Sequence, residues 1–333
     1  MLSRRRPLWW FMLLALLLLL VSIVSLVTGK YPLSLGELWQ SLITAGRAET
    51  NADIVLWNLR LPRLLAGIVV GASLAAAGAS YQAMFRNPLV SPDILGVSAG
   101  AGLGAVFAIF LSLPLAAVQL FAFVGGLMAV ALVYLISLTS RQFDPTLVLV
   151  LAGVAIGSLL GAGISLIKIL ADPYSQLATI TFWLLGGLNA VSKSELLWAL
   201  PFMLLGLLPL ILLRWRINLL SLSDMEAQAL GVNTGFLRFL LIICATLMTA
   251  AAVSFTGIIG WIGLVIPHVA RLLVGPEFSR LLPSSLLIGS IFLVLTDNVA
   301  RNAASIELPL GVLTSLIGAP FFLYLLLKGR SHG

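Results

Sequence analysis

Residues 146–170 read TLVLVLAGVAIGSLLGAGISLIKIL, an apolar run whose one charged side chain is Lys168. About 20 consecutive apolar residues are enough for a helix to cross the hydrocarbon core of a bilayer. In lipid, only helices and closed barrels satisfy every backbone hydrogen bond, and barrel strands would show alternating polarity. This unbroken run therefore predicts an all-α membrane protein.

The rest of the chain has the same character. Of its 333 residues, 60% are hydrophobic and 9% are charged, whereas soluble domains carry about 25% charged residues. Nine further apolar segments are predicted to span, at residues 8–28, 63–84, 93–112, 114–138, 195–213, 235–256, 258–272, 284–301 and 308–327. We therefore expect one transmembrane domain of ten helices over residues 1–333.

The basic residues predict the orientation of this bundle. If the N-terminus is inside and the spans alternate, twelve of the 19 lysines and arginines lie inside and seven lie outside or in the membrane. Because cytoplasmic loops are enriched in these residues, both termini are predicted to be cytoplasmic, with residues 29–62 forming an external loop. The basic residues are scattered rather than clustered, so we do not expect a nucleic-acid partner. The single cysteine, Cys244, excludes an internal disulfide.

Glycines recur at four-residue spacing in several spans. They form the pair Gly67 and Gly71 and two series, Gly96–Gly100–Gly104 and Gly153–Gly157–Gly161. Such spacing places a flat stripe on one helix face, where a neighbouring backbone approaches closely. The pattern predicts a tightly packed bundle.

A short polar stretch separates the spans at 195–213 and 235–256. Ser223 and Glu226 have the spacing of a capping box, and Gly231 supplies a stop. They predict a helix from Asp224 to Leu230 that is too short to span. A surface helix between two spans lies on the membrane or docks on a partner. Asp144-Pro145 and Ser91-Pro92 predict helix starts in the same way.

The chain carries little catalytic chemistry. It has no G-x-x-x-x-G-K-[ST] phosphate loop and, with two histidines and one cysteine, no Cys/His metal cluster. Gly96-Val97-Ser98-Ala99-Gly100 matches the G-x-S-x-G nucleophile pattern but lacks its strand–turn–helix context. An intramembrane serine hydrolase using Ser98 and His268 therefore stays a remote alternative. A secondary transporter is a second one, disfavoured because few ionisable groups lie inside the spans.

Three arginines are predicted at the outer face, namely Arg60, Arg63 and Arg301. Asp297 and Arg301 are four residues apart and can pair on one helix face. Each arginine alone fits an interface anchor. Together they form a basic rim that suits an acidic partner or anionic cargo.

Several motifs extend this interpretation. In chain order they are Arg60-Leu61-Pro62-Arg63, Arg86-Asn87-Pro88-Leu89, Pro92-Asp93-Ile94-Leu95-Gly96, Ala229-Leu230-Gly231, Gly263-Leu264-Val265-Ile266-Pro267-His268, Asp297 to Arg301, Glu307-Leu308-Pro309-Leu310-Gly311 and Gly318-Ala319-Pro320. In this order and spacing, from about residue 60 to 325, the chain resembles the FecCD-type permeases of type II ABC importers. That family includes permeases for ferric siderophores, haem and vitamin B12. One departure is Trp261, where some relatives carry phenylalanine.

The resemblance implies a non-catalytic permease subunit of the bacterial inner membrane. It implies alternating access at the interface with a second permease, either a second copy or a similar paralogue. Two cytoplasmic ATPase subunits would bind the ATP and Mg²⁺, and a periplasmic or lipid-anchored substrate-binding protein would deliver the cargo. This chain itself is expected to hold no cofactor. A ferric siderophore is the expected cargo, with vitamin B12, haem and molybdate left open.

The resemblance also implies roles for particular residues. Arg60, Arg63 and Arg301 are expected to dock the binding protein. Residues 214–234 are expected to be the cytoplasmic segment that couples to the ATPase, through Leu222, Ser223, Asp224, Glu226, Ala229, Leu230 and Gly231. An inner gate is expected at Gln142, Phe143, Asp144 and Thr146.

Overall fold

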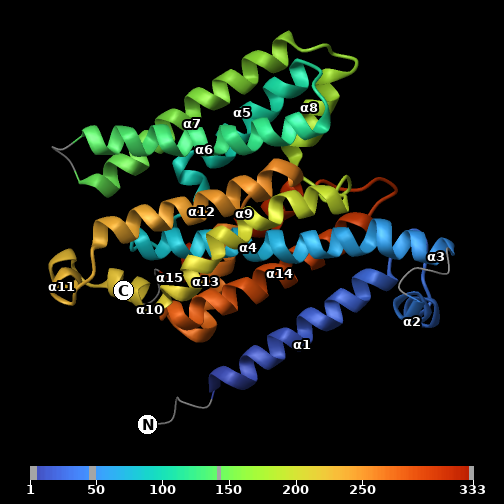
Figure 1. Ribbon diagram of the computed structural model, residues 1–333, viewed down its shortest axis with the longest axis horizontal. Coiled ribbons are helices and arrows are strands. Elements are labelled where there is room, and N and C mark those ends of the chain that lie inside the picture. Colours follow the sequence, from blue (N-terminus) through green and yellow to red (C-terminus); the bar gives the residue numbers. More distant parts are fainter. Residues whose placement is uncertain (1–5, 45–49, 141–143, 330–333) are drawn as a thin grey trace.

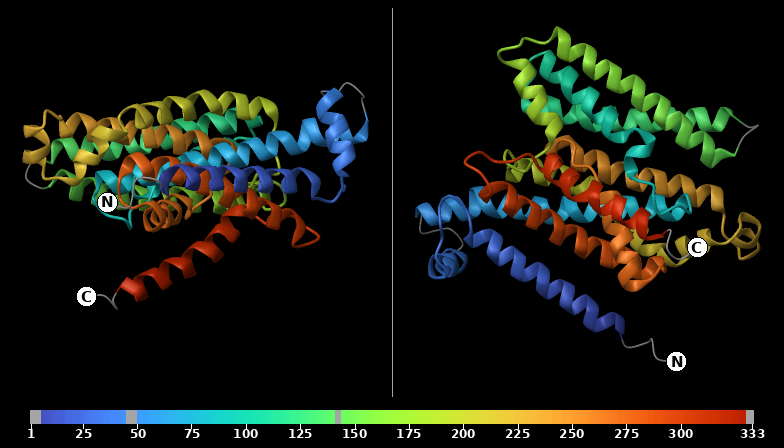
Figure 2. Two further views of the ribbon diagram at one scale, coloured as in Figure 1. Left: turned by 90° about the horizontal axis from the view of Figure 1, so that it is seen from below. Right: turned by 180° about the vertical axis from the view of Figure 1, so that it is seen from behind.

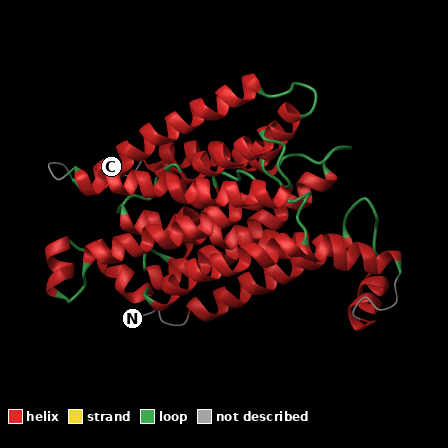
Figure 3. Cartoon of the chain, turned by 45° about the horizontal axis from the view of Figure 1, so that its top comes forward, coloured by secondary structure: helices red, strands yellow, loops and turns green. Residues whose placement is uncertain are grey.

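A computed structural model describes residues 6–44, 50–140 and 144–329, and every regular element within these ranges is helical (Figures 1 and 3). Seven helical stretches of the described chain are long and apolar enough to cross a membrane. They contain α1 (Arg6–Val27), α4 (Leu61–Met84), α6 (Leu115–Thr139), α7 (Pro145–Leu170), α9 (Lys193–Leu212), α12 (Thr234–Thr256) and α14 (Phe278–Asn302). Shorter apolar helices are α5 (Val97–Phe110), α8 (Gln176–Leu185), α13 (Ile262–Val274) and α15 (Leu310–Gly329).

The remaining elements are short and lie between the apolar helices. They are α2 (Leu35–Thr44), α3 (Asn51–Ile54), the π-helix η1 (Val55–Arg60), the 3₁₀ helices η2 (Pro92–Leu95) and η3 (Leu219–Ser221), α10 (Arg214–Asn218) and α11 (Asp224–Ala229). Elements α3 and η1 run directly into α4, so the second predicted span is the end of a longer helical stretch over residues 51–84.

Each of the ten predicted spans overlaps one of these helices, and the all-α fold class is confirmed. The span expected at 93–112 differs, because residues 92–95 form a 3₁₀ turn and α5 begins only at Val97. Ser91 precedes that turn, but its side chain makes no capping bond. The sequence prediction missed α8, whose ten residues are about 15 Å long and fall below the spanning length.

Glycines set the closest helix contacts, as the four-residue spacing predicts. A Cβ on Gly71 would lie 2.3 Å from the carbonyl oxygen of Gly289, and one on Gly100 would lie 2.4 Å from that of Gly125. These positions admit no side chain because the obstacle is backbone. The prediction is wrong for Gly157 and Gly161, where a Cβ would meet nothing within 4 Å. In this series the close backbone contact is made by Gly153, where a Cβ would lie 2.0 Å from the carbonyl oxygen of Ile94.

The long helices run roughly alongside one another, so the bundle has two ends (Figures 1 and 2). At one end, here called the Arg63 end, α4 begins and α14 finishes. At the other, the Arg86 end, α4 finishes and the short helix α11 protrudes (Figure 1). Helix α15 diverges from the bundle toward the Arg86 end, as the left view of Figure 2 shows.

Candidate functional site

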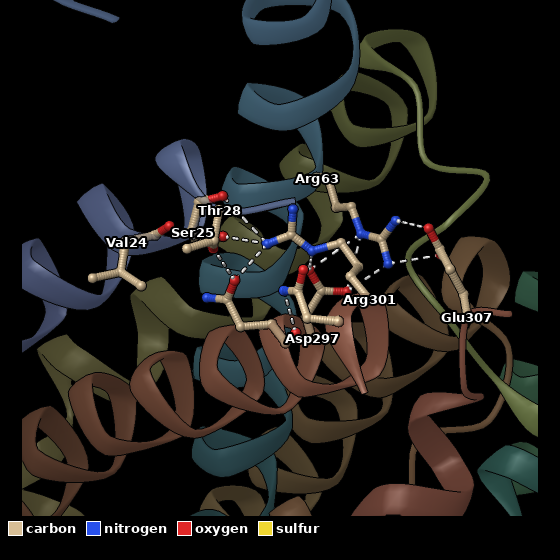
Figure 4. A network of polar contacts seen from close by, with 9 residues as sticks. Val24, Ser25, Thr28, Arg63, Asp297, Arg301 and Glu307 are labelled. Atoms are coloured by element: carbon tan, nitrogen blue, oxygen red, sulfur yellow. Dashed lines mark hydrogen bonds and ion pairs between the residues drawn. The ribbon is translucent and has the colours of Figure 1, made fainter. Parts of the chain in front are cut away.

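The Arg63 end holds a cluster of charged side chains from three segments (Figure 4). Arg63 in the first turn of α4 donates from Nη2 to Asp297 Oδ1 at 2.8 Å, and its Nε lies 3.0 Å from the same oxygen. The same guanidinium binds Glu307 with both terminal nitrogens, Nη1 to Oε1 at 3.2 Å and Nη2 to Oε2 at 3.0 Å. Arg63 therefore joins the start of α4 to the last turns of α14 and to the segment that leads into α15.

Arg301 completes the cluster from α14. Its Nε lies 3.2 Å from Asp297 Oδ2, so the predicted pairing of these two residues is confirmed. Its Nη2 donates to Ser25 Oγ at 2.9 Å and to Asn298 Oδ1 at 2.8 Å. Arg301 therefore attaches the end of α1 to α14, and one carboxylate, that of Asp297, serves two arginines.

Arg60 has a different environment from the other two arginines. It is 7% exposed, and its guanidinium donates to the backbone carbonyls of Leu26, Val27 and Tyr31. These carbonyls follow the last turn of α1 or lie within it, where helices leave acceptors unsatisfied. A Cβ at Gly29 would lie 2.8 Å from Arg60 Nη2, which explains a glycine there.

The structure thus brings the three predicted docking arginines together at one end, and it engages all of them inside the chain. Arg301 is 9% exposed, and the side chain of Arg63 is 13% exposed. Sequence reasoning did not find Glu307, Ser25 or Asn298 as partners. The only available signal was that Glu307 belongs to the Glu307–Gly311 motif, which does not indicate what the carboxylate binds.

A cavity of about 270 Å³ lies beside this cluster. Arg63 and Glu307 line it, together with the polar side chains of Gln119, Asn189 and Glu195. The Arg63–Glu307 pair is therefore reached from a cavity whose remaining lining is largely apolar, whereas the side chain of Asp297 is only 4% exposed.

At the Arg86 end, the predicted capping box is confirmed. Ser223 Oγ accepts from the Glu226 amide, and the Glu226 carboxylate accepts from the Ser223 hydroxyl at 2.7 Å and the Ser223 amide at 2.9 Å. These two donors hold the pKa of Glu226 below its usual range, so the carboxylate is ionised at neutral pH. Gly231 follows with φ +80°, a conformation that favours glycine. Helix α11 is thus a defined element with fixed ends.

Asp224, the first residue of α11, connects this helix to the bundle. Its Oδ1 accepts from Arg86 Nη2 at 2.8 Å and from Arg238 Nη2 at 2.8 Å. Arg86 stands two residues past the end of α4 and also donates from Nε to the carbonyl of Leu220 at 2.5 Å. Arg238 lies on α12. We refer to Asp224, Arg86 and Arg238 as the Asp224 clamp.

The two faces of α11 differ in polarity and exposure. Ala227 is fully buried, and Val232 beyond the helix is 8% exposed. Met225 and Leu230 are 82% and 61% exposed, respectively. Two large apolar side chains are therefore exposed on this short polar helix and directly after it. Of the other predicted coupling residues, Leu222 is half-buried and precedes the helix, and Ala229 is exposed in its last turn.

The predicted gate region is described only in part, because Gln142 and Phe143 lie outside the described residues. Asp144 is the N-cap of α7, and its side chain accepts from the amides of Thr146 and Leu147. Thr146 is half-buried in the first turn. Their part in a gate stays a prediction.

The alternative catalytic interpretation gains no support from the geometry. The hydroxyl of Ser98 donates to the Asp93 carboxylate, so it is oriented as a donor to an acid rather than toward a histidine base. Within the described chain there is no group of three or more His, Cys, Asp and Glu side chains that could hold a metal ion. The described chain thus has one cluster of charged side chains at each end of the bundle.

Comparison with known proteins gives the family. The model of the FecCD transport family matches residues 17–328, and the chain belongs to this family. A "Probable iron chelatin transport system permease protein" of Helicobacter pylori is 42% identical over 93% of this chain and 96% of the relative. A "Molybdate import system permease protein MolB" of Haemophilus influenzae is 40% identical over 94% of each.

A solved structure is also similar along nearly the whole chain. Its description names an inward-facing conformation and a metal-chelate type ABC transporter. The TM-score is 0.88 with 38% sequence identity, over 96% of this chain and 99% of the other. The protein is an ABC importer permease of the FecCD type, a multi-pass membrane transport subunit.

Proposed function

We propose that this permease carries a ferric siderophore or a related iron chelate across the inner membrane. The observation that carries the proposal is that names for iron cargo recur among similar relatives, including two iron chelatin permeases that are 42% and 41% identical to this chain. Relatives named for Fe(3+)-citrate and hemin, at 37% and 38% identity, support the same class of cargo. The described residues hold no metal-ligand cluster, so the iron would travel inside its chelator.

A specific observation favours a second candidate. Relatives named for molybdate and cobalamin import are 40% and 43% identical over similar shares of the chain. Identity alone therefore does not separate an iron chelate from a molybdate oxyanion or vitamin B12.

The orientation that we propose has the Arg86 end in the cytoplasm and the Arg63 end outside, with both termini cytoplasmic. The two ends then face different partners. Two ATPase subunits would bind ATP and Mg²⁺ at the Arg86 end, and a substrate-binding protein would dock at the Arg63 end. A second permease subunit would complete the translocation path. The exposed side chains of Leu151, Leu159 and Leu166 on α7 are consistent with such a neighbour.

At the Arg86 end, α11 would transmit motion from the ATPase. Met225 and Leu230 are exposed to contact a partner, while Asp224 and Ala227 face the bundle. The helix thus has one side for the ATPase and one side for the permease body. This division supports the coupling role predicted for residues 222–231.

At the Arg63 end, the docking centre would be Arg60, Arg63 and Arg301. Arg63 and Arg301 pair with the carboxylates of Asp297 and Glu307, whereas Arg60 donates to backbone carbonyls, so these five side chains carry one net positive charge. Lys30 lies at the same end, where it donates to the carbonyl of Ser305 at 3.0 Å. The net positive charge of these five side chains would attract a carboxylate of an acidic partner surface.

The experiment that tests the cargo is cellular uptake with and without this gene. Cells would receive ⁵⁵Fe-labelled catecholate and hydroxamate siderophores, haem, vitamin B12 or ⁹⁹Mo-molybdate in separate assays. We expect loss of iron-siderophore uptake in the deletion strain and its return on complementation. Loss of molybdate or vitamin B12 uptake alone would overturn the iron proposal and establish the second candidate.

A further inference from the structure

The ion pair of Arg63 and Glu307 at the Arg63 end is accessible from a cavity. Arg63 binds two carboxylates of unequal accessibility. Asp297 is 4% exposed, while Glu307 is 34% exposed. Both Arg63 and Glu307 line the cavity of about 270 Å³.

The two carboxylates also differ in what they do for the fold. Asp297 binds both Arg63 and Arg301, so it is the shared anion of α4 and α14. Among the described residues, Glu307 forms its side-chain hydrogen bonds with Arg63 alone, through two nitrogens and two oxygens. Arg63 would keep its buried partner if Glu307 moved away, because Nε and Nη2 remain on Asp297.

We infer that Glu307 is a placeholder: it occupies on Arg63 the position that a carboxylate of the docking substrate-binding protein takes, and docking exchanges one carboxylate for the other. This inference rests on the proposed docking function of the Arg63 end. A docking arginine must offer hydrogen-bond donors to a partner, whereas Arg63 already binds two carboxylates of its own chain. The exchange reconciles these two facts. The Glu307 fork is where Arg63 can offer them without losing Asp297.

Displacement of Glu307 would affect the chain segment in which it lies. The segment 303–309 links α14 to α15, and it is held by Lys30 Nζ on the Ser305 carbonyl and by the Leu308 amide on the Ala300 carbonyl. The Arg63–Glu307 pair is its other charged attachment. Just beyond, the Leu310 amide donates to Gly186 O at 2.9 Å, next to α8. Displacing Glu307 therefore loosens the segment at the start of α15.

The test measures docking on the complete importer in nanodiscs. The probe is the cargo-loaded substrate-binding protein that supports uptake through this permease, and its affinity is measured by biolayer interferometry. Glu307→Gln removes the competing carboxylate. For a partly exposed pair we expect about a two- to fivefold tighter complex. Arg63→Gln should weaken docking about tenfold.

In the double variant with both Arg63→Gln and Glu307→Gln, docking should be no tighter than in Arg63→Gln alone. The arginine for which the two carboxylates compete is then absent. Asp172→Asn is the matched control: it also removes one exposed negative charge at the Arg63 end, and Asp172 binds Ser175 rather than an arginine. Glu307→Asp is a second variant that keeps the charge but shortens the reach, and it should also tighten docking. Thermal unfolding of each variant verifies that it is folded.

The outcomes separate this inference from the docking proposal. Suppose that Arg63→Gln weakens docking, while Glu307→Gln leaves the affinity unchanged or raises it no more than Asp172→Asn does. The placeholder role of Glu307 is then refuted and the docking site stands. If neither substitution changes the affinity, both are refuted. A gain that disappears in the Arg63→Gln background supports the exchange.

Discussion

Replacing Asp224 by asparagine should uncouple ATP hydrolysis from transport. The substitution keeps the size of the side chain and removes the charge that Arg86 and Arg238 share. Both contacts are 2.8 Å long, and the three side chains are 24–43% exposed. Solvent screens such pairs, so each contributes about 0.5 kcal/mol rather than the value of a buried pair.

The two contacts together thus amount to about 1 kcal/mol, which corresponds to about a fivefold shift toward α11 detached from the bundle. The assay is a purified importer in proteoliposomes, with ATP hydrolysed and cargo transported measured in parallel. We expect hydrolysis to continue and cargo moved per ATP to fall by up to about fivefold, because motion of α11 no longer reaches α4 and α12.

Asp224 also lies at a helix N-terminus, where a negative charge is favourable by itself. A double-mutant cycle with Arg86→Gln isolates the clamp, since the effect of the helix terminus persists in both backgrounds. Glu277→Gln is the control. It breaks the ion pair between Glu277 and Arg280, which is similarly exposed but does not involve α11. An unchanged transport-to-hydrolysis ratio in Asp224→Asn, or strictly additive effects in the cycle, would refute the reasoning.

Further predictions concern stability and coupling. Gly78→Ala should destabilise the bundle by about 1–3 kcal/mol, because its Cβ would lie 1.8 Å from Gly263 O, while Gly157→Ala, with no neighbour within 4 Å, should leave the melting temperature in detergent unchanged. Arg60→Gln should lower the amount of folded protein, because carbonyl groups at the end of α1 lose their charged donor, at a cost of about 1–3 kcal/mol in folding free energy. Accumulation equal to that of the wild type would contradict this. Leu230→Asp should abolish ATPase binding in pull-down experiments without changing the melting temperature, because this side chain is 61% exposed. The capping box should be formed above the ordinary pKa of glutamate and lost as the pH falls through the lowered pKa of Glu226; hydrogen exchange of the α11 amides, corrected for intrinsic rates, measures this.

Much of the fold was predictable because hydropathy reports burial in lipid directly. The capping box at Ser223 and the pairing of Asp297 with Arg301 were predictable too, since both rest on spacings of three or four residues. Helix α8 was not predictable, because ten apolar residues are also compatible with a loop or a buried segment.

The partners of the arginines were beyond sequence reasoning. Arg63 meets Asp297 and Glu307 across 234 and 244 residues of chain, and no local pattern specifies such a contact. An outer rim of arginines was predicted, but a pattern of charges does not show which charges are already neutralised. Glycine stripes have the same weakness: Gly71 packs against α14, whereas Gly157 faces open space.

At each end of the bundle one carboxylate is shared by two arginines, and α4 connects the two ends. At the Arg63 end, Asp297 is shared by Arg63 of α4 and Arg301 of α14. At the Arg86 end, Asp224 of α11 is shared by Arg86, just past α4, and Arg238 of α12. Helix α4 thus bears an arginine contact at each end of 24 continuous residues, about 36 Å of hydrogen-bonded helix. Close glycine contacts with α13 and α14 leave no room for it to bend independently of them. In the coupling that we propose, a displacement of α11 would act through Arg86 on the helix whose other end holds Arg63.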